Sequence, residues 1–177
     1  MPTKTGESYQ TVKYTNQSNL NFNPLAKAKD SALVFLSHRD RSVKEMIDKL
    51  HKKGYEPEII KKVIHILLQS DLLDDEKFAM LFSRSKVEAR SWGPDKLRYE
   101  LTLKGIDKEI LEITIDKIYE KYSQYDLIRT LLSKRIKSES EVNAKETKKH
   151  VDFLKRRGYR WDVIREAIAD IERLSID

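Results

Sequence analysis

The sequence predicts an all-α protein, a tandem array of three three-helix repeats that together form an elongated, curved, right-handed or similar helical array. The chain has 177 residues with only five glycines and four prolines, too few turn residues for an all-β fold. Three of the glycines stand in one local pattern at intervals of roughly fifty residues, a period typical of repeated supersecondary units. Between them, apolar residues recur three and four positions apart, as they do along the buried face of a helix.

The repeated pattern surrounds Gly54, Gly105 and Gly158. In each copy a leucine precedes the glycine by four positions, and an apolar or aromatic residue follows it directly. Further apolar residues occupy the fifth, sixth and tenth positions after the glycine. Glycine lacks the Cβ that makes left-handed backbone costly, so it commonly ends a helix. We therefore expect each of these glycines to end the middle helix of a repeat.

The first repeat is assigned to residues 30–73 and follows a flexible tail, residues 1–29, which is polar and has little periodicity. Its helices are predicted at residues 31–38, 43–53 and 57–70. Ser42 and Glu45 have the spacing of a capping box at the start of the second helix. Pro57 suits the first position of the third helix, where no amide hydrogen is needed. One face of that helix is apolar and is formed by Ile59, Ile60, Val63, Ile64, Leu67 and Leu68.

The second repeat is assigned to residues 74–123. Its helices are predicted at residues 75–90, 94–104 and 108–122. Asp74 and Asp107 are suited to cap the first and third helices, because a carboxylate can accept hydrogen bonds from the free amides there. Pro94 suits the first position of the middle helix, and Gly105 ends it.

The third repeat is assigned to residues 124–177. Its helices are predicted at residues 125–137, 144–157 and 161–174. Asn143 and Glu146 have capping-box spacing at the start of the middle helix. The polar segment 137–146 interrupts the rhythm of the repeat, and we interpret it as a loop or a frayed helix start.

Composition and motifs argue against an enzyme, a cofactor or a metal site. The chain has no cysteine, which excludes a thiolate nucleophile, a cysteine-held metal and a disulfide. Its four histidines lack the spacing of a zinc site, and there is no glycine-rich phosphate loop. The acidic cluster at residues 71–76 coincides with a predicted helix start, where the dipole favours carboxylates, so it is assigned to capping.

The chain also lacks the features of a membrane or secreted protein. No apolar run approaches the roughly 18 residues that a membrane span needs. The N-terminus does not have the basic and then apolar pattern of a signal peptide. We therefore expect a cytoplasmic protein.

Basic residues exceed acidic ones, which gives a net charge of +6 and a pI of about 9.3. Several cations directly precede a repeat glycine, at the end of a predicted helix, where the dipole stabilises them without any partner. Alternatively, the repetition aligns them into one basic face that binds phosphates or an acidic protein groove. The candidates for this face are Arg84, Arg90, Lys96, Arg98, Lys104, Arg156, Arg157 and Arg160.

One stretch resembles the signature of the RecX regulatory family. It is DLLDDEKFAMLFSRSKVEARSWGPDKLRYELTLKGI, residues 71–106. An acidic pair precedes Phe-Ala, an arginine-bearing helix follows, and then come Gly-Pro, an Arg-x-x-Leu helix and Lys-Gly. The third copy, FLKRRGYRWDVIREAI at residues 153–168, is similar to the C-terminal unit of that family. The similarity extends over residues 31–174.

The resemblance implies a monomeric regulatory protein that binds the RecA recombinase and its DNA filament. Members of the family usually inhibit ATP hydrolysis and strand exchange, and so regulate recombination, DNA repair and the SOS response. Many also bind single- or double-stranded DNA directly. On this interpretation the eight candidate cations would meet the filament or its DNA. A stand-alone helical DNA-binding protein and a generic helical scaffold for other proteins remain the alternatives.

Overall fold

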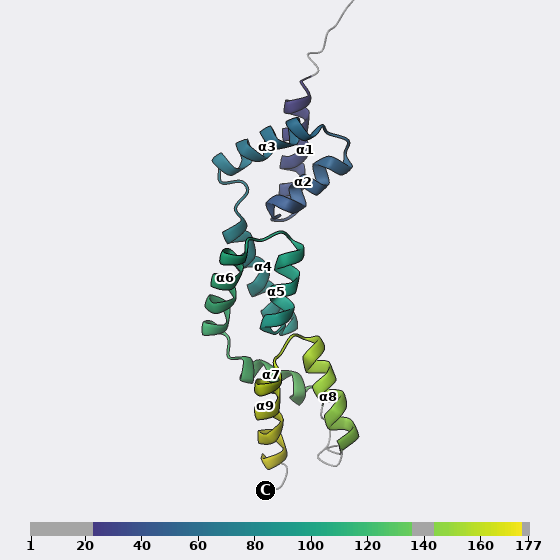
Figure 1. The fold of residues 1–177 in the computed structure, drawn as a ribbon, viewed down its shortest axis with the longest axis vertical. Helices are drawn as coiled ribbons and strands as arrows, with labels where there is room; N and C mark the ends of the chain where they lie inside the picture. The colour runs from purple at the N-terminus through teal and green to yellow at the C-terminus, as the bar shows by residue number, and fades with distance from the viewer. Residues whose placement is uncertain (1–22, 136–143, 175–177) are drawn as a thin grey trace, which may run out of the picture.

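The computed structural model describes residues 23–135 and 144–174, and within these ranges it contains nine helices and no strand (Figure 1). The first repeat consists of α1 (Pro24–His38), α2 (Val43–Lys52) and α3 (Pro57–Gln69). The second consists of α4 (Asp75–Arg90), α5 (Pro94–Leu103) and α6 (Lys108–Lys121). The third consists of α7 (Gln124–Ser133), α8 (Ala144–Arg156) and α9 (Trp161–Leu174). The repeats follow one another along the long axis, which confirms the predicted elongated array of three-helix units.

The start of the array differs from the prediction. Helix α1 begins at Pro24 and not near residue 31, so the assignment of residues 24–29 to a flexible tail is wrong. The Asn23 side chain accepts hydrogen bonds from the amides of Leu25 and Ala26, and Pro24 takes the first helical position. The remainder of the predicted tail lies outside the described residues. So do residues 136–143, which include most of the predicted polar segment in the third repeat.

The predicted helix caps form at three helix starts. Ser42 Oγ accepts from the Glu45 amide at 3.2 Å, and Asp74 accepts from the Lys77 amide at 2.9 Å. Asp107 caps the start of α6 in the same way. The capping box at α2 is only half formed, because the Glu45 carboxylate turns away to bind two cations. That carboxylate becomes part of the contact between the first two repeats.

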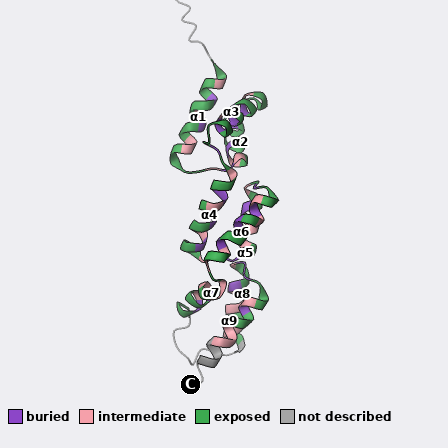
Figure 2. Ribbon diagram, turned by 90° about the vertical axis from the view of Figure 1, so that its left-hand side faces the viewer, coloured by how far each residue is buried: buried purple, intermediate pink, exposed green. Residues whose placement is uncertain are grey.

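Each repeat has its own hydrophobic core. Buried residues lie between the three helices of a unit, and the outward faces of the helices are largely exposed (Figure 2). Met46, Leu97 and Leu154 are fully buried in the first, second and third core. Because the fully buried residues of each core come from one unit, the relative position of the repeats depends largely on the contacts at the joints between them.

The repeat glycines end the middle helices, as predicted. Their φ angles are +83° at Gly54, +74° at Gly105 and +88° at Gly158, the left-handed region that favours glycine. We call the turn formed by each glycine and its two neighbours a glycine seat; the three seats are residues 53–55, 104–106 and 157–159. The second and third seats each receive the start of the middle helix of the preceding repeat. As a result α8, α5 and α2 follow one another in a row along the array (Figure 1).

The first joint places the start of α2 on the second seat. Ser42 Oγ donates a hydrogen bond to the Lys104 carbonyl oxygen at 2.7 Å. Lys44 Nζ donates to the Leu103 carbonyl oxygen at 3.0 Å. Lys104 Nζ in turn forms an ion pair of 2.7 Å with Glu45. The positive end of one helix thus meets the carbonyl end of the next, an arrangement that the helix dipoles favour.

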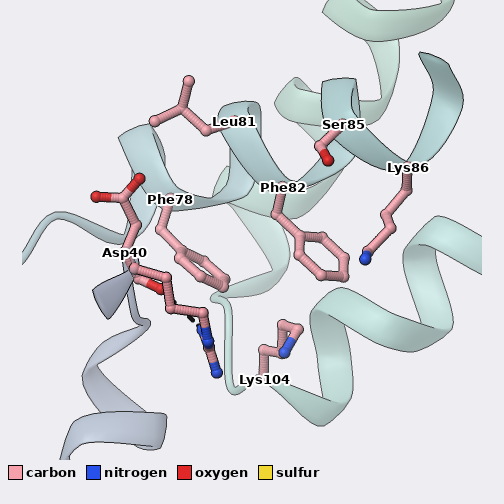
Figure 3. A pocket seen from close by; sticks show the side chains of 8 residues that line it. Asp40, Phe78, Leu81, Phe82, Ser85, Lys86 and Lys104 are labelled. Carbon is pink, nitrogen blue, oxygen red and sulfur yellow. Dashed lines mark hydrogen bonds between the residues drawn. The ribbon is translucent and has the colours of Figure 1, made fainter. Parts of the chain in front are cut away.

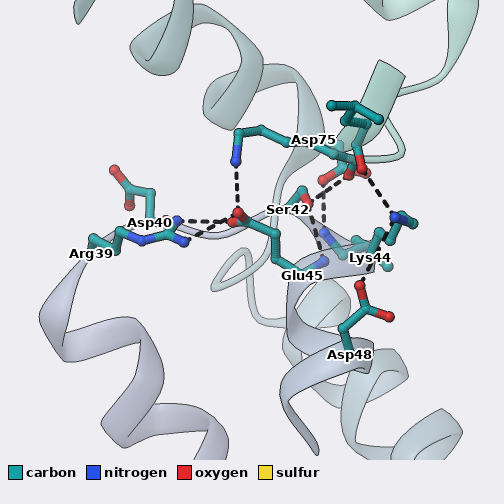
Figure 4. A network of polar contacts seen from close by, with 10 residues as sticks. Arg39, Asp40, Ser42, Lys44, Glu45, Asp48 and Asp75 are labelled. Atoms are coloured by element: carbon teal, nitrogen blue, oxygen red, sulfur yellow. Dashed lines mark hydrogen bonds and ion pairs between the residues drawn. The ribbon is translucent and has the colours of Figure 1, made fainter. Parts of the chain in front are cut away.

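Further polar contacts brace this joint (Figure 4). Arg39 forms two hydrogen bonds with the Glu45 carboxylate, at 2.8 and 3.1 Å. Asp75, at the start of α4, accepts a hydrogen bond from the Val43 amide at 2.9 Å. The acidic cluster predicted to serve in capping does so here across two repeats, because Asp75 satisfies a free amide at the start of α2.

The second joint relies on the backbone. The Gly93 amide donates to the Arg157 carbonyl oxygen at 2.7 Å, and the Asp95 amide donates to the Gly158 carbonyl oxygen at 3.1 Å. The two chain segments approach so closely that a Cβ on Gly158 would lie 2.2 Å from the Lys96 nitrogen. Both Gly93 and Gly158 are therefore required by the contact itself.

Candidate binding surface

Three aromatic side chains form a strip along α4 and the turn that follows it. Phe78 and Phe82 stack with ring centroids 5.8 Å apart, and Phe82 meets Trp92 edge to face at 6.3 Å. Phe78 is buried, whereas Phe82 and Trp92 are half-buried. Phe78 thus belongs to the core of the second repeat, and the half-buried rings of Phe82 and Trp92 pack against that core and reach its surface.

Four cations lie over these rings, within the distance at which the ring faces attract positive charge. Lys104 Nζ is 4.9 Å and Lys86 Nζ 5.1 Å from the centroid of Phe82. Lys96 Nζ is 5.6 Å from the centroid of Trp92. The four are Lys86, Arg90, Lys96 and Lys104. We call this set of three rings and four cations the basic–aromatic face.

At one end the basic–aromatic face opens into a cleft of about 440 Å³ between the first and second repeats. Figure 3 shows Phe78 and Phe82 projecting from α4 towards Lys104, with Lys86 further along the helix. The first repeat adds Arg39 and Asp40 to the lining. Three cations and one carboxylate therefore line this cleft, which favours an anionic partner.

The charges at this cleft are partly committed to the first joint. Glu45 is bound by both Arg39 and Lys104. Burial alone would raise the pKa of Glu45, but the hydrogen bonds from these two cations outweigh it and lower the pKa to about 2. Glu45 therefore stays ionised, and Lys104 is held in place at the edge of the cleft.

Three of the eight predicted cations belong to the basic–aromatic face: Arg90, Lys96 and Lys104. Arg98 does not, because residues two apart on a helix point roughly 200° apart, and Lys96 already faces Trp92. Arg98 instead binds Glu112 at 2.9 and 3.0 Å and Asp95 at 2.8 Å.

The other predicted cations lie elsewhere. Arg160 joins Arg98 in a second cleft of about 450 Å³, where three carboxylates outnumber the two cations. Arg84 forms an exposed ion pair with Glu88 at 2.9 Å. Arg157 donates a hydrogen bond to the carbonyl oxygen of the last residue of α4, and Arg156 is exposed on α8. A shared binding role for all eight stays a prediction, and the structure groups only three of them.

Two cations beside the aromatic strip and its cleft, Lys86 and Arg39, were missed in the sequence. Lys86 and Arg90 continue the spacing of four that begins with Phe78 and Phe82, so the order of rings and cations along α4 was a usable signal. Arg39 gave no such signal, because it reaches the cleft only through the packing of the first repeat on the second.

Other kinds of site find no support in the part of the chain that the structure describes. No group of three or more histidine, aspartate or glutamate side chains is arranged to hold a metal ion there. None of the described helices is long and apolar enough to cross a membrane.

Models of one protein family match three successive parts of the chain. The first three-helix domain of RecX matches residues 28–67, the second matches residues 74–115 and the third matches residues 122–168. These matches coincide with the three repeats of the structure.

Individual relatives agree with the family models. The chain is 36% identical over 150 residues to the regulatory protein RecX of Bacillus subtilis, covering 82% of this chain and 55% of that protein. It is 31% identical over 147 residues to the regulatory protein RecX of Vibrio vulnificus, covering 83% and 94%. The chain spans about half the length of the two Bacillus relatives that it matches.

Solved structures extend the comparison to the fold. The crystal structure of RecX from Lactobacillus salivarius superposes with a TM-score of 0.74 at 27% sequence identity, covering 84% of this chain and 97% of that one. A second crystal structure, of regulatory protein RecX, has a TM-score of 0.71 at 21% identity and supports the fold. With three consecutive domains matched and relatives above 30% identity, the chain belongs to the RecX family of regulatory proteins.

Proposed function

We propose that this protein binds the filament that a RecA recombinase forms on DNA, in the cytoplasm, and lowers its ATP hydrolysis and strand exchange. Membership of the RecX family is the observation that carries the proposal. The consequence would be control of recombination, DNA repair and the SOS response. The protein would act by binding, with no catalysis or cofactor of its own.

The basic–aromatic face is the surface that we assign to this contact. It combines four cations with the partly exposed rings of Phe82 and Trp92, and in its cleft three cations outnumber one carboxylate. Phosphates and acidic protein surfaces both fit such a face, since cations supply most of the attraction to either. The cleft that contains Arg98 and Arg160 fits less well, because carboxylates prevail there.

The elongated shape supports inhibition along a filament. A filament groove presents the same contacts repeatedly, and an array of repeats can follow such a groove over several subunits. A protein bound in this way would hold neighbouring recombinase subunits in one arrangement and oppose the changes that accompany ATP hydrolysis.

A triple alanine variant tests the surface. Lys86→Ala, Arg90→Ala and Lys96→Ala remove three cations of the face and leave Lys104, which the first joint needs. The matched control is Lys61→Ala, Lys62→Ala and Lys117→Ala, which removes three exposed lysines elsewhere and gives the same net charge. Both variants should melt near the temperature of the parent.

We expect the parent to inhibit the ATPase of RecA on single-stranded DNA, and the control to inhibit equally well. The triple variant should bind the filament about tenfold more weakly, since three exposed charge contacts of roughly 0.5 kcal/mol each amount to about 1.5 kcal/mol. Its affinity should also depend less on salt. The slope of the logarithm of the binding constant against the logarithm of the salt concentration should become shallower by roughly 0.7 for each phosphate that the variant no longer neutralises. Equal inhibition by both variants would remove this face from the function.

Direct DNA binding without a recombinase is the second candidate. Cations beside aromatic rings are typical of single-strand binding surfaces, where bases stack on the rings. Figure 3 shows such neighbours in Phe82 and Lys86. If the parent leaves the ATPase unchanged but binds naked single-stranded DNA, and the triple variant loses that binding, this second function replaces the first.

A further inference from the structure

The first repeat carries a glycine seat that no part of the described chain occupies. Its backbone matches the two occupied seats: the Gly54 amide donates to the His51 carbonyl at 2.9 Å and the Tyr55 amide to the Leu50 carbonyl at 3.3 Å. The turn at Gly105 has the same two hydrogen bonds. Yet a Cβ on Gly54 would meet no described atom within 4 Å, whereas one on Gly105 would meet the neighbouring repeat at 2.6 Å.

The third repeat carries a helix start that matches the one in the first joint. In α2 the second residue, Lys44, binds the Leu103 carbonyl oxygen directly before the second seat, and the third, Glu45, pairs with Lys104 within it. In α8 the second and third residues are again a lysine and a glutamate, Lys145 and Glu146. The middle helix of the third repeat therefore begins with the same lysine–glutamate pair that helps to join the first repeat to the second.

The empty seat has the matching partner residue. Lys53 precedes Gly54 as Lys104 precedes Gly105, and Lys104 is the residue that pairs with Glu45. Lys53 and Gly54 are both exposed. The amine of Lys53 now lies 3.3 Å from Ser31 Oγ on the surface, so it can turn towards an arriving carboxylate.

We propose that copies of this protein bind one another end to end, with the start of α8 in one copy placed on the seat 53–55 of the next. Such a contact would repeat the first joint between molecules and would continue the row of middle helices from one copy to the next. The two surfaces are different, so the contact leaves a seat free at one end and a helix start at the other. It forms open chains of copies and not closed dimers. It rests on the two joints within the chain and is independent of the proposed recombinase partner.

The contact should be weak between free molecules. It consists of one ion pair and a few hydrogen bonds at the surface, each of which contributes little in water. A dilute sample would thus contain single copies, as the sequence predicts. Copies aligned end to end on a common partner would meet at a high effective concentration, which makes the same contact strong enough to produce cooperative binding.

Cysteine pairs can trap the contact, because the natural chain has no cysteine. One variant carries Lys52→Cys, directly before the empty seat, at the position that corresponds to Leu103 before the second seat. The other carries Lys145→Cys, which corresponds to Lys44. We expect mixed full-length variants, at several hundred micromolar under mild oxidation, to form a disulfide between unlike chains. Neither variant alone should form its own dimer at a comparable rate, since like positions do not meet.

Three controls are needed to interpret the cross-linking rate. A chain with both Lys44→Cys and Leu103→Cys should close within itself and report the rate for an occupied seat. A mixture of Lys52→Cys with Lys117→Cys, an exposed site on α6, measures random collision. Adding Lys53→Glu to the Lys52→Cys chain should slow the cross-link several-fold, and adding Glu146→Lys to its partner should restore the rate.

The outcome decides between occupants of the seat. A cross-link between Lys52→Cys and Lys145→Cys that exceeds the collision rate and follows the charge exchange supports end-to-end binding of copies. A cross-link no faster than the Lys117→Cys control, with both chains melting like the parent, overturns the proposal. The seat would then be free in solution or filled by another segment or another protein.

Discussion

The three repeat glycines have nearly the same backbone conformation. Replacing each of them by alanine, one at a time, should nevertheless destabilise the protein by a different amount. The change is a single added methyl group at Gly54, Gly105 or Gly158. What differs is its neighbour in space. Gly54 faces open space, Gly105 faces the Lys44 side chain and Gly158 faces the backbone at Lys96.

The expected costs follow from these neighbours. Gly54→Ala costs only the left-handed backbone of an L-residue, about 1–2 kcal/mol. Gly105→Ala costs the same and also displaces Lys44, whose Cδ would lie 2.6 Å away, so the hydrogen bond from Lys44 to the Leu103 carbonyl oxygen is broken. That bond adds about 1 kcal/mol, for a total of about 2–3 kcal/mol.

Gly158→Ala should be the most costly of the three. The methyl group would lie 2.2 Å from the Lys96 nitrogen and 2.9 Å from its Cα, and backbone cannot swing aside as a side chain can. The start of α5 must move, which breaks the hydrogen bonds of the Gly93 and Asp95 amides across the second joint. With two bonds of about 1 kcal/mol each added to the backbone cost, the total is about 3–4 kcal/mol.

Urea denaturation followed by circular dichroism at 222 nm measures the series. The free energy of unfolding should decrease in the order Gly54→Ala, Gly105→Ala, Gly158→Ala. The Gly54 variant is the matched control, because subtracting its cost isolates the contribution of each joint. Equal losses for all three would contradict this order, since the seats would then contribute nothing beyond their own turn.

Two further predictions concern single side chains. The pKa of Glu45 is lowered from 4.5 to about 2. The ionised carboxylate therefore adds to the free energy of unfolding above pH 4.5, and this stabilisation is lost as the pH falls towards 2. It amounts to at most about 3 kcal/mol. Urea unfolding at pH 6 and pH 3 should therefore show a larger loss for the parent than for Glu45→Gln, and equal losses would argue against the assigned ion pairs. Asn23→Ala should lower the free energy of unfolding by about 1 kcal/mol because it removes the cap of α1, while Asn23→Ser should retain most of it. Thermal melting of the two variants checks this, and identical curves would mean that α1 does not depend on its cap.

Local signals were sufficient to predict most of the fold. Pro57, Pro94 and the repeat glycines fixed helix ends because each acts on its own backbone, independent of distant contacts. Asn23 and Pro24 carry the same kind of signal for the start of α1, which the predicted boundary near residue 31 does not use. Helix α1 buries the small residues Ala28 and Ala32, which give a weaker apolar pattern than leucine or isoleucine.

The candidate binding surface was less predictable, since it depends on direction and on distant contacts. Lys96 and Arg98 are close in the sequence but diverge on the helix, and only Lys96 reaches the aromatic strip. Lys104 pairs with Glu45 across 59 positions of the sequence. No spacing rule within one repeat could have revealed that pair, because it arises from the way two repeats dock.

The two joints differ in a way that governs how the array can bend. Each pair of neighbouring repeats is tied twice, by a short covalent link and by an occupied seat; in Figure 1 the links from α3 to α4 and from α6 to α7 run along the left edge. Such a joint would bend by opening its seat, with the covalent link between the two repeats as the pivot. At the first joint the second seat is held partly by the ion pair between Lys104 and Glu45, which weakens as added salt screens it. At the second joint backbone hydrogen bonds hold the third seat, and salt affects them little. Added salt should therefore loosen the joint between the first and second repeats more than the joint between the second and third, so that bending of the array is concentrated at the first joint.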